Sequence, residues 1–171
     1  MTQAIRIKAT GGPEVLNWED VQLGAPAIGE VHVRHNAVGV NYIDIYHRTG
    51  AYPLPLPSGL GVEGAGVVLA VGDGVTGFKA GDRVAYAGGP PGAYAEERFV
   101  PAARVLKLPD NIGFDAAADL QGTDSRVPDP SLLQREARRR SSISSGCWRC
   151  RFDRMSMAQR TGRNSHRHRQ R

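Results

Sequence analysis

Side chains that could bind or polarise a small molecule gather in residues 39–66. Asn41, Asp44 and Tyr46 lie near the start of a helix-like run over residues 42–48, and Tyr52 follows it. Amide, carboxylate and phenol groups all take part in hydrogen bonds. Each also has a structural interpretation, since Asp44 could cap the helix and the tyrosines could pack with one polar edge in water. The residues alone leave both interpretations open.

The flanking segments predict how these side chains are held. Alternating apolar and polar residues over 31–38 predict a strand that leads into the helix. Prolines at 53, 55 and 57 predict a rigid, extended passage after it, because each proline fixes φ and biases the residue before it away from helix. Glycines at 59, 61, 64 and 66 then predict a close approach of two backbones.

The pattern over residues 1–122 predicts a mainly β fold with short helices. We expect strands over residues 4–8, 15–21, 30–40, 61–72, 82–87, 93–100 and 104–108, and a helix from about residue 114. Many short strands separated by Gly and Pro favour a small, partly closed β-barrel. The spacing Gly59-x-Gly61-x-x-Gly64 imitates a dinucleotide fingerprint, but no strand–helix–strand unit with an acidic residue about 20 positions later surrounds it.

Charge divides the chain into two unlike parts. Residues 1–122 carry nine basic and 13 acidic side chains, whereas residues 123–171 carry 13 Arg, no Lys and four acids. The basic pI of about 9.6 therefore belongs to the second part. We expect a folded domain over residues 1–122 and an Arg- and Ser-rich tail over residues 123–171, whose composition predicts disorder.

Cysteine use and hydropathy predict the environment of the chain. Both cysteines lie in the tail, so residues 1–122 offer neither a disulfide nor a thiolate ligand. The N-terminus lacks the pattern of a signal peptide, and no apolar run approaches 18 residues. We expect a cytoplasmic, soluble protein with no membrane partner.

Several spaced motifs in residues 1–122 carry a family resemblance. They are GGPEVL at 11–16, NYID at 41–44, GLGVEGAG at 59–66, AGDRV at 80–84 and LQG at 120–122. This part of the chain resembles the N-terminal, GroES-like domain of the medium-chain dehydrogenase/reductase superfamily. Within that superfamily it is most similar to the zinc-free quinone oxidoreductases related to zeta-crystallin.

The resemblance implies an activity and a set of site residues. It implies an NADPH-dependent quinone or enone oxidoreductase, in which hydride passes from the nicotinamide to the substrate between this domain and a Rossmann domain. It implies that Tyr46 and Tyr52 are catalytic and that Asn41, Asp44 and Tyr46 contact the cofactor. Hydrogen-bond donors of this kind could stabilise charge on a carbonyl oxygen.

The same resemblance implies that zinc is absent. Zinc-dependent relatives have a cysteine near position 41 and a histidine in a Gly-His-Glu motif, whereas this chain has Asn41 and Gly61-Val62-Glu63. An amide and an isopropyl group are not the thiolate and imidazole ligands that zinc favours. The four cysteines of the superfamily's structural zinc lobe are also lacking, and a loop at 88–92 stands in their place.

The genetic code offers an explanation for the tail. Family members continue after Leu-Gln-Gly with a helix, a strand and a glycine-rich loop of the form Ala-Ala-Gly-Gly-Val-Gly. If residues 123–171 are translated one nucleotide out of frame, Trp148 before an arginine codon must restore Gly, and Cys147 and Cys150 must each restore Ala or Val. Residues 146–151 are thus compatible with that loop. We expect a frameshift at or just after Gly122 and loss of the Rossmann domain.

Two consequences and one alternative follow. A polypeptide without the nucleotide-binding loop is expected to be inactive by itself. It is also not expected to form oligomers, because full-length relatives often pair through the nucleotide domain. The alternative is a non-enzymatic barrel whose arginine-rich tail binds nucleic acid or another acidic partner. No sequence-reading module accompanies the arginines, so we expect no specific nucleic-acid recognition. Cys147 and Cys150 with His166 and His168 suggest zinc, but the His-x-His spacing is too short for a zinc finger, and the frameshift accounts for both cysteines.

Overall fold

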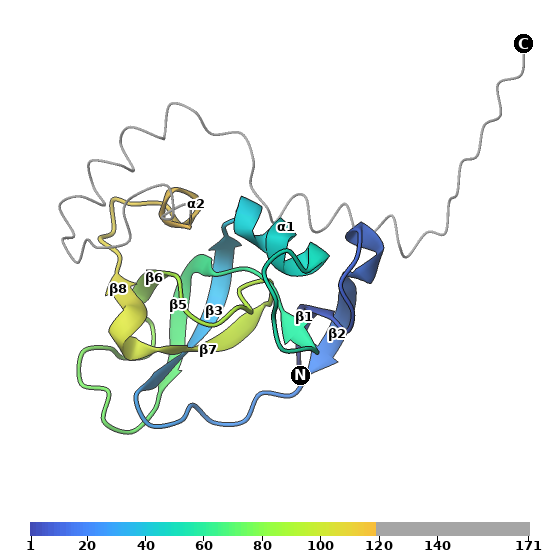
Figure 1. Ribbon diagram of the computed structural model, residues 1–171. Coiled ribbons are helices and arrows are strands. Elements are labelled where there is room, and N and C mark those ends of the chain that lie inside the picture. Colours follow the sequence, from blue (N-terminus) through green and yellow to red (C-terminus); the bar gives the residue numbers. More distant parts are fainter. Residues whose placement is uncertain (119–171) are drawn as a thin grey trace, which may run out of the picture.

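Two β-sheets with short helices make up the described part of the chain. The computed structural model describes residues 1–118 of the 171 (Figure 1). The smaller sheet has the order β2-β1-β4 and the larger sheet the order β7-β3-β5-β6-β8, with every pair antiparallel. The strands of the two sheets are β1 (Thr2–Ile7), β2 (Asn17–Val21), β3 (Glu30–Val38), β4 (Ser58–Gly59), β5 (Glu63–Val71), β6 (Arg83–Ala87), β7 (Glu97–Pro101) and β8 (Val105–Lys107). The predicted mainly β class is confirmed.

Four short helical segments connect these strands. The α-helices are α1 (Tyr42–Thr49) and α2 (Phe114–Ala117), and the 3-10 helices are η1 (Pro13–Val15) and η2 (Ala102–Arg104). Figure 1 shows α1 between the upper end of β3 and the smaller sheet, and α2 above the other end of the larger sheet. Helix α1 thereby lies at one rim of the domain, next to the place where both sheets meet.

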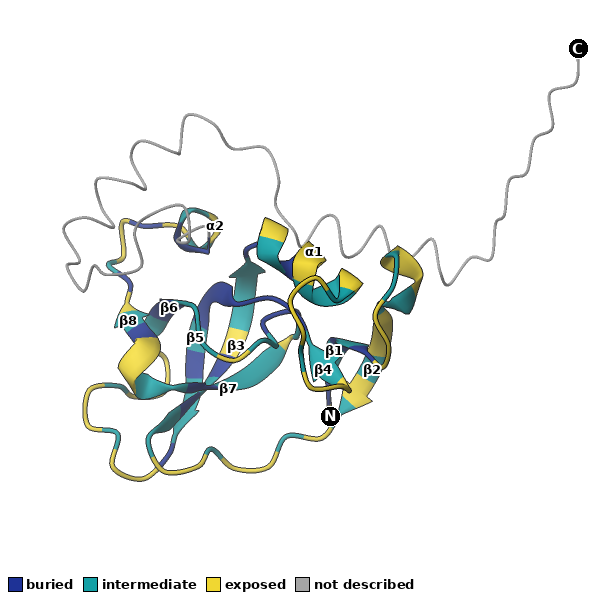
Figure 2. Cartoon of the chain, viewed as in Figure 1, coloured by how far each residue is buried: buried dark blue, intermediate teal, exposed yellow. Residues whose placement is uncertain are grey.

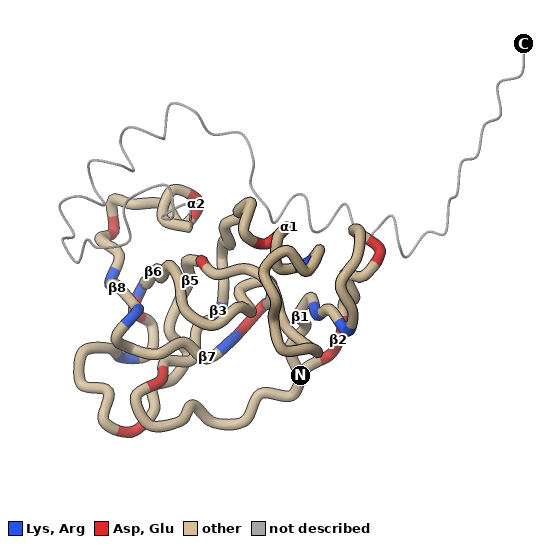
Figure 3. The backbone as a smooth tube through the Cα atoms, viewed as in Figure 1, with Lys and Arg blue, Asp and Glu red and all other residues tan. Residues whose placement is uncertain are grey.

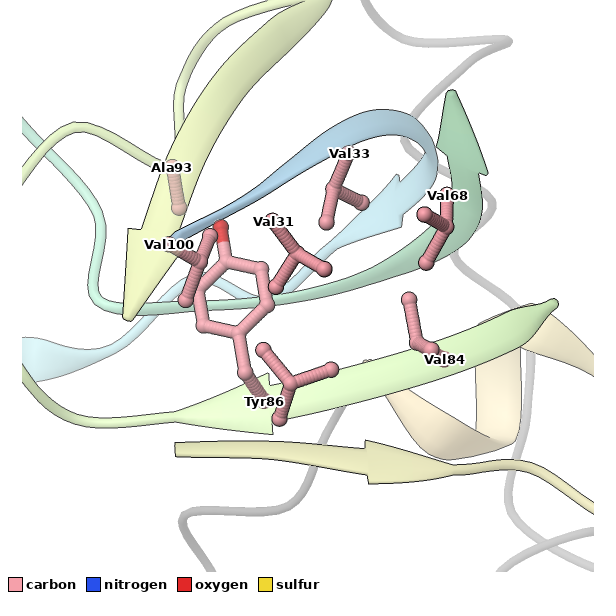
Figure 4. Close-up of a cluster of buried hydrophobic side chains, with 8 residues drawn as sticks. Val31, Val33, Val68, Val84, Tyr86, Ala93 and Val100 are labelled. Carbon is pink, nitrogen blue, oxygen red and sulfur yellow. The ribbon is translucent and has the colours of Figure 1, made fainter. Parts of the chain in front are cut away.

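Most side chains of the main core come from the strands of the larger sheet. Branched residues on alternate positions of β3, β5 and β6 point inward because side chains on a strand alternate between its faces. The cluster includes Val31, Val33, Val68, Val84, Tyr86, Ala93 and Val100, all 1% exposed or less (Figure 4). A second cluster packs α2 against this sheet, and a third joins the two sheets through Ile5, Ile7, Leu60 and Tyr94.

The predicted close approach of backbones occurs at two of the four glycines between residues 59 and 66. A Cβ at Gly66 would overlap the carbonyl oxygen of Arg34 on the paired strand β3. A Cβ at Gly59 would come within 2.8 Å of the Cα of Gly92. Gly61, by contrast, has a φ angle of +83°, a backbone conformation that residues other than glycine rarely adopt. No helix begins within the 59–66 segment, so it is not a dinucleotide-binding loop.

Three elements differ from the sequence-based expectation in ways that have a physical reason. The strand expected over 15–21 begins at Asn17, because Pro13 starts a 3-10 turn that ends at Val15. The strand expected over 93–100 begins at Glu97, and the residues before it contribute only an isolated bridge from Ala95 to Ala4. The two-residue strand β4 was not predicted, since its pairing with β1 is a long-range contact.

The tail and the end of the predicted domain lie outside the described residues. This applies to the domain boundary at residue 122, the expected disorder of residues 123–171 and the frameshift. Among residues 1–118, no helix combines the length and hydropathy needed to cross a membrane.

Candidate functional site

A capping box builds the start of α1 and places the predicted polar residues. Asn41 has an extended backbone, and its N–H donates to Asp44 Oδ2 at 2.9 Å. The Asp44 N–H in turn donates to the Asn41 backbone carbonyl at 3.1 Å. A carboxylate at the third helical position satisfies N–H groups that the helix leaves unpaired. Gly50 ends the helix in the left-handed region, with φ 86°.

The Asn41 side chain bonds to a carboxyl group inside the domain. Its amide nitrogen Nδ2 donates to Glu63 Oε1 at 2.5 Å. Glu63 begins β5 and its side chain is completely buried. Gly39 leaves the room that this carboxyl needs, because a Cβ there would overlap Glu63 Oε1. The contact therefore joins the start of α1 to the central strand of the larger sheet.

The Asp44 carboxylate has a second buried partner. The Tyr94 hydroxyl donates to Asp44 Oδ2 at 2.8 Å, and Asp44 is 4% exposed. Burial raises the pKa of the Tyr94 phenol, and the nearby Asp44 charge adds to this effect. Tyr94 thus stays protonated and acts as a donor. The capping interpretation of Asp44 is confirmed, while its proposed contact with a cofactor stays a prediction.

Tyr46 and Tyr52 form an exposed aromatic pair beside these buried groups. Their ring centroids lie 5.3 Å apart at an interplanar angle of 64°, and the Tyr52 N–H donates to the Tyr46 carbonyl at 3.1 Å. The side chains are 43% and 52% exposed. Within residues 1–118, neither hydroxyl has a hydrogen-bond partner. The two phenols are therefore available to a ligand, and the edge-to-face packing holds their rings.

The aromatic pair belongs to a larger exposed apolar surface. Figure 2 shows that α1 and the segment after it are largely exposed, whereas β5 runs through the interior. We call this surface the α1 face, and it comprises Val40, Tyr42, Ile45, Tyr46, Tyr52 and Leu56. An exposed apolar patch of this kind marks a binding surface more often than chance.

The sequence analysis gave no role to His35, a half-buried histidine on β3. His35 Nδ1 lies 2.6 Å from the Ala95 carbonyl oxygen, and its Nε2 lies 2.7 Å from the Tyr86 hydroxyl. Because the carbonyl can only accept, Nδ1 carries the proton and Tyr86 donates to Nε2. Burial lowers the pKa of His35 to about 4 and raises that of Tyr86 to about 12. This pair stabilises the barrel and lies among core residues.

The residues at the family's zinc positions do not form a metal site. Asn41 bonds to Glu63, and Val62 is an apolar core residue with 4% exposure. Within the described part of the chain, no three His, Cys, Asp or Glu side chains lie together as candidate ligands. The donor set at positions 41, 62 and 63 therefore does not fit zinc.

The four predicted site residues thus divide between two environments. Asn41 and Asp44 direct polar atoms into the domain, and Tyr46 and Tyr52 lie partly in solvent. The sequence analysis missed Glu63 as the partner of Asn41 and Tyr94 as the partner of Asp44. Both partners are distant in sequence, so no local spacing indicated them.

Comparison with known proteins identifies the domain. Residues 27–110 match the alcohol dehydrogenase GroES-like domain. The match spans 84 of the 171 residues, so it is the described domain, and not the whole chain, that belongs to this family. The described fold is its GroES-like domain, as the resemblance implied, and the similar proteins that follow are oxidoreductases.

Two relatives and one solved structure are similar to the GroES-like domain. A quinone oxidoreductase of Pseudomonas aeruginosa is 55% identical over 119 residues, which are 69% of this chain and 37% of the relative. A 2-haloacrylate reductase of a Burkholderia species is 43% identical over 120 residues, 67% of this chain and 36% of the relative. The structure of Escherichia coli quinone oxidoreductase complexed with NADPH aligns with a TM-score of 0.67 and 46% identity. That alignment covers 68% of this chain and 36% of the other.

The chain thus spans just over a third of the length of these relatives. The resemblance to medium-chain quinone oxidoreductases is confirmed for the GroES-like domain. No comparison tests the roles of Asn41, Asp44, Tyr46 and Tyr52.

Proposed function

We propose that the GroES-like domain forms the substrate-facing wall of an NADPH-dependent reductase that transfers hydride to a quinone or an enone. The observation that carries this proposal is the exposed Tyr46–Tyr52 pair, on and just after the helix that Asn41 caps, in a domain 55% identical to a quinone oxidoreductase. The alignments with an NADPH complex and with a 2-haloacrylate reductase support the cofactor and an activated alkene as a possible substrate class.

The chain's own residues would act by hydrogen bonding and orientation. When bound, NADPH supplies the hydride. The Tyr46 and Tyr52 hydroxyls can donate to a quinone oxygen on which negative charge develops, in the manner of an oxyanion hole. Asn41, Asp44 and Tyr46 would contact the cofactor, as the family resemblance implies. Asp44 holds Asn41 and Tyr94 in place and sets the start of the helix that carries Tyr46.

We also propose that this chemistry proceeds without zinc. The positions that bind zinc in related dehydrogenases hold an amide committed to Glu63 and a buried valine. Polarisation of the substrate then falls to hydrogen-bond donors. Loading the purified chain with Zn²⁺ is expected to leave its unfolding temperature unchanged, because a metal bound to the native state would raise it.

The 171-residue polypeptide is proposed to be inactive by itself. Pyrophosphate binding in dinucleotide enzymes depends on a glycine-rich loop and a helix N-terminus. The first 118 residues hold no such strand–loop–helix unit, and residues 123–171 contain only two glycines. One wall of a cleft offers few contacts to a cofactor.

We propose that residues 123–171 are an out-of-frame translation of a nucleotide-binding segment. The support comes from the codons of Cys147, Trp148 and Cys150, which restore Ala or Val, Gly, and Ala or Val in the neighbouring frame. Met157 before Ala158 likewise restores Trp. These residues lie outside the described part of the chain.

A chimera tests the proposed function. Residues 1–122 would replace the matching segment of the Pseudomonas aeruginosa quinone oxidoreductase, leaving the rest of that protein unchanged. We expect the chimera to oxidise NADPH only when a quinone such as 1,4-naphthoquinone is present. The unmodified relative is the control. A folded chimera that binds NADPH but oxidises none with quinones or enones would refute the proposal.

A second candidate function rests on the tail. Its 13 arginines would attract a nucleic acid or another acidic partner. Figure 3 shows acidic and basic positions mixed along the described domain, so the positive charge is a property of the tail alone. Retention on heparin that survives physiological salt and disappears on truncation at Gly122 would favour this candidate over non-specific attraction.

A further inference from the structure

The Asn41 amide lies beside a buried carboxyl to which the proposed function gives no role. Glu63 is fully buried in a domain whose other acidic side chains, Asp44 apart, have contact with solvent. Burying a carboxyl group is costly unless hydrogen bonds satisfy it. Its retention at the first position of β5 therefore calls for an explanation in terms of the groups around it.

The surroundings of Glu63 aim it at the start of α1. Oε1 accepts the Asn41 Nδ2–H bond at 2.5 Å, which is a short distance for this kind of bond. The Gly39 N–H donates to the Glu63 backbone carbonyl at 3.3 Å, so the strand and the chain entering α1 are joined at two points. Gly39 also lacks the Cβ that would displace the carboxyl.

The second buried contact fixes the same helix turn from the other side. Asp44 Oδ2 accepts both the Asn41 N–H and the Tyr94 O–H. The backbone of Asn41 is therefore held by Asp44 and its side chain by Glu63. An amide held at both points has little rotational freedom. One Nδ2–H is used by Glu63, which leaves the other for an external acceptor.

We propose that Glu63 is a positioning residue, which orients the Asn41 amide so that its second N–H is presented to the bound substrate or cofactor. This inference rests on the proposed function for the identity of the ligand, but not for the geometry. Glu63 acts through Asn41 and touches no ligand itself. The buried Asp44–Tyr94 contact supplies the rigid base on which this orientation depends.

Two variants and one matched control test the inference in the full 171-residue chain. Glu63→Gln keeps the size of the side chain but replaces the carboxyl group with an amide. Asn41→Asp places two carboxyl groups against each other. Glu97→Gln makes the same chemical change at a carboxylate on β7, which pairs with His32 of β3 and lies away from α1. Side-chain amide signals are followed by ¹⁵N NMR, and unfolding temperatures by circular dichroism.

The Asn41 amide signals report the orientation directly. In Glu63→Gln we expect them to shift upfield and to lose part of their protection from hydrogen exchange, because the carboxyl acceptor has been replaced by an amide. In Glu97→Gln they should stay at their parent positions. Unchanged Asn41 signals in a folded Glu63→Gln variant would overturn the proposal.

Rescue by the double variant is the decisive measurement. Asn41→Asp should lower the unfolding temperature, and Asn41→Asp combined with Glu63→Gln should restore most of the loss, since the amide and carboxylate have then exchanged places. No rescue would overturn the proposal, even if Glu63→Gln alone fails to fold. Because neither readout needs turnover, an inactive chimera would count against the proposed function and not against the role of Glu63.

Discussion

Polar atoms at neighbouring positions of one helix serve different purposes in this domain. Asn41 and Asp44 hold the helix start against β5 and Tyr94, whereas the Tyr46 hydroxyl has no partner within residues 1–118. A buried polar group needs a hydrogen-bond partner within the protein, whereas an exposed phenol can bond to water. The available hydroxyls are therefore the groups whose removal should affect a ligand without affecting the fold.

Removal of one hydroxyl from the aromatic pair should affect the chemistry alone. In the chimera, Tyr46→Phe and Tyr52→Phe are each expected to lower kcat/KM for a quinone about 10- to 100-fold, the range for loss of a donor to a developing oxyanion. Tyr42→Phe is the matched control on the same helix, because Tyr42 is 79% exposed and outside the pair. Steady-state kinetics with unchanged unfolding temperatures would confirm the assignment. Equal kcat/KM values in all three variants would remove both tyrosines from the site.

We expect the half-buried His35 to lower the free energy of unfolding of the domain in mild acid. Its pKa is lowered from 6.5 to about 4 in the folded chain, chiefly by burial. As the pH falls below 6.5, His35 becomes protonated in the unfolded chain but stays neutral in the folded chain. The free energy of unfolding therefore decreases until about pH 4. We expect a loss of roughly 2 kcal/mol between pH 7.5 and pH 5 from this residue.

Urea unfolding at the two pH values measures this effect. His35→Gln should show a smaller difference between pH 7.5 and pH 5 than the parent chain. His32→Gln, three residues away on the same strand, is the matched control for the removal of an imidazole. A parent chain and a His35→Gln variant with the same pH dependence would show that His35 does not resist protonation.

At the scale of elements, the pairing of β3 with β5 decides where α1 can begin. The two strands form the longest ladder in the described part of the chain, from Val31↔Val71 to Val38↔Gly64, with irregularities near His32 and Asn36. Gly66 lets the strands approach at one of these points. The ladder then brings Glu63, at the end of this pairing, next to the residues that enter α1.

A methyl group at Gly66 should therefore destabilise the whole domain. The added Cβ would overlap the Arg34 carbonyl oxygen, and backbone atoms cannot move aside as a flexible side chain can. We expect Gly66→Ala to lower the free energy of unfolding by about 2 kcal/mol or more, as overpacking does. Gly77→Ala is the control, because a Cβ there meets nothing within 4 Å. Denaturant unfolding that places both variants within 0.5 kcal/mol of the parent, the usual range for neutral surface changes, would contradict this account.

At the scale of the whole molecule, the domain presents an apolar α1 face for which residues 1–118 supply no cover. The chain spans just over a third of the relatives that it matches. The proposed cofactor contacts come from the one domain that is described. We therefore expect the purified 171-residue polypeptide to oxidise no NADPH with 1,4-naphthoquinone, at enzyme concentrations where the chimera shows full activity. Turnover by the polypeptide itself would contradict the proposal that it is inactive alone.

The origin of the tail has its own test. Sequencing of the gene across the Gly122 codon and about 700 bases beyond Arg171 would cover a further domain of on the order of 100–200 residues. We expect that one inserted or deleted base near Gly122 restores a glycine-rich nucleotide loop. A frame that contains no such continuation in any register would remove the frameshift explanation and favour the arginine-rich binding candidate.

Local patterns in the sequence were enough to predict every strand except β4, the helix after Asn41 and the GroES-like domain. Alternation of apolar residues, proline constraints and glycine spacing act within a few residues, so they can be recognised without a structure. The motifs at 11–16, 41–44, 59–66 and 80–84 depend on the same short distances. They also indicated Asn41, Asp44, Tyr46 and Tyr52 as candidates, although their chemical roles came from the resemblance.

Only the tertiary structure decided which of these groups are buried and what they contact. The bonds from Asn41 to Glu63 and from Tyr94 to Asp44 join residues 22 and 50 positions apart. His35 and Tyr86, 51 positions apart, meet across β5, because their strands β3 and β6 both pair with it. Contacts of this range depend on strand register and on the room left by Gly39 and Gly66, which act through space and leave no pattern along the chain.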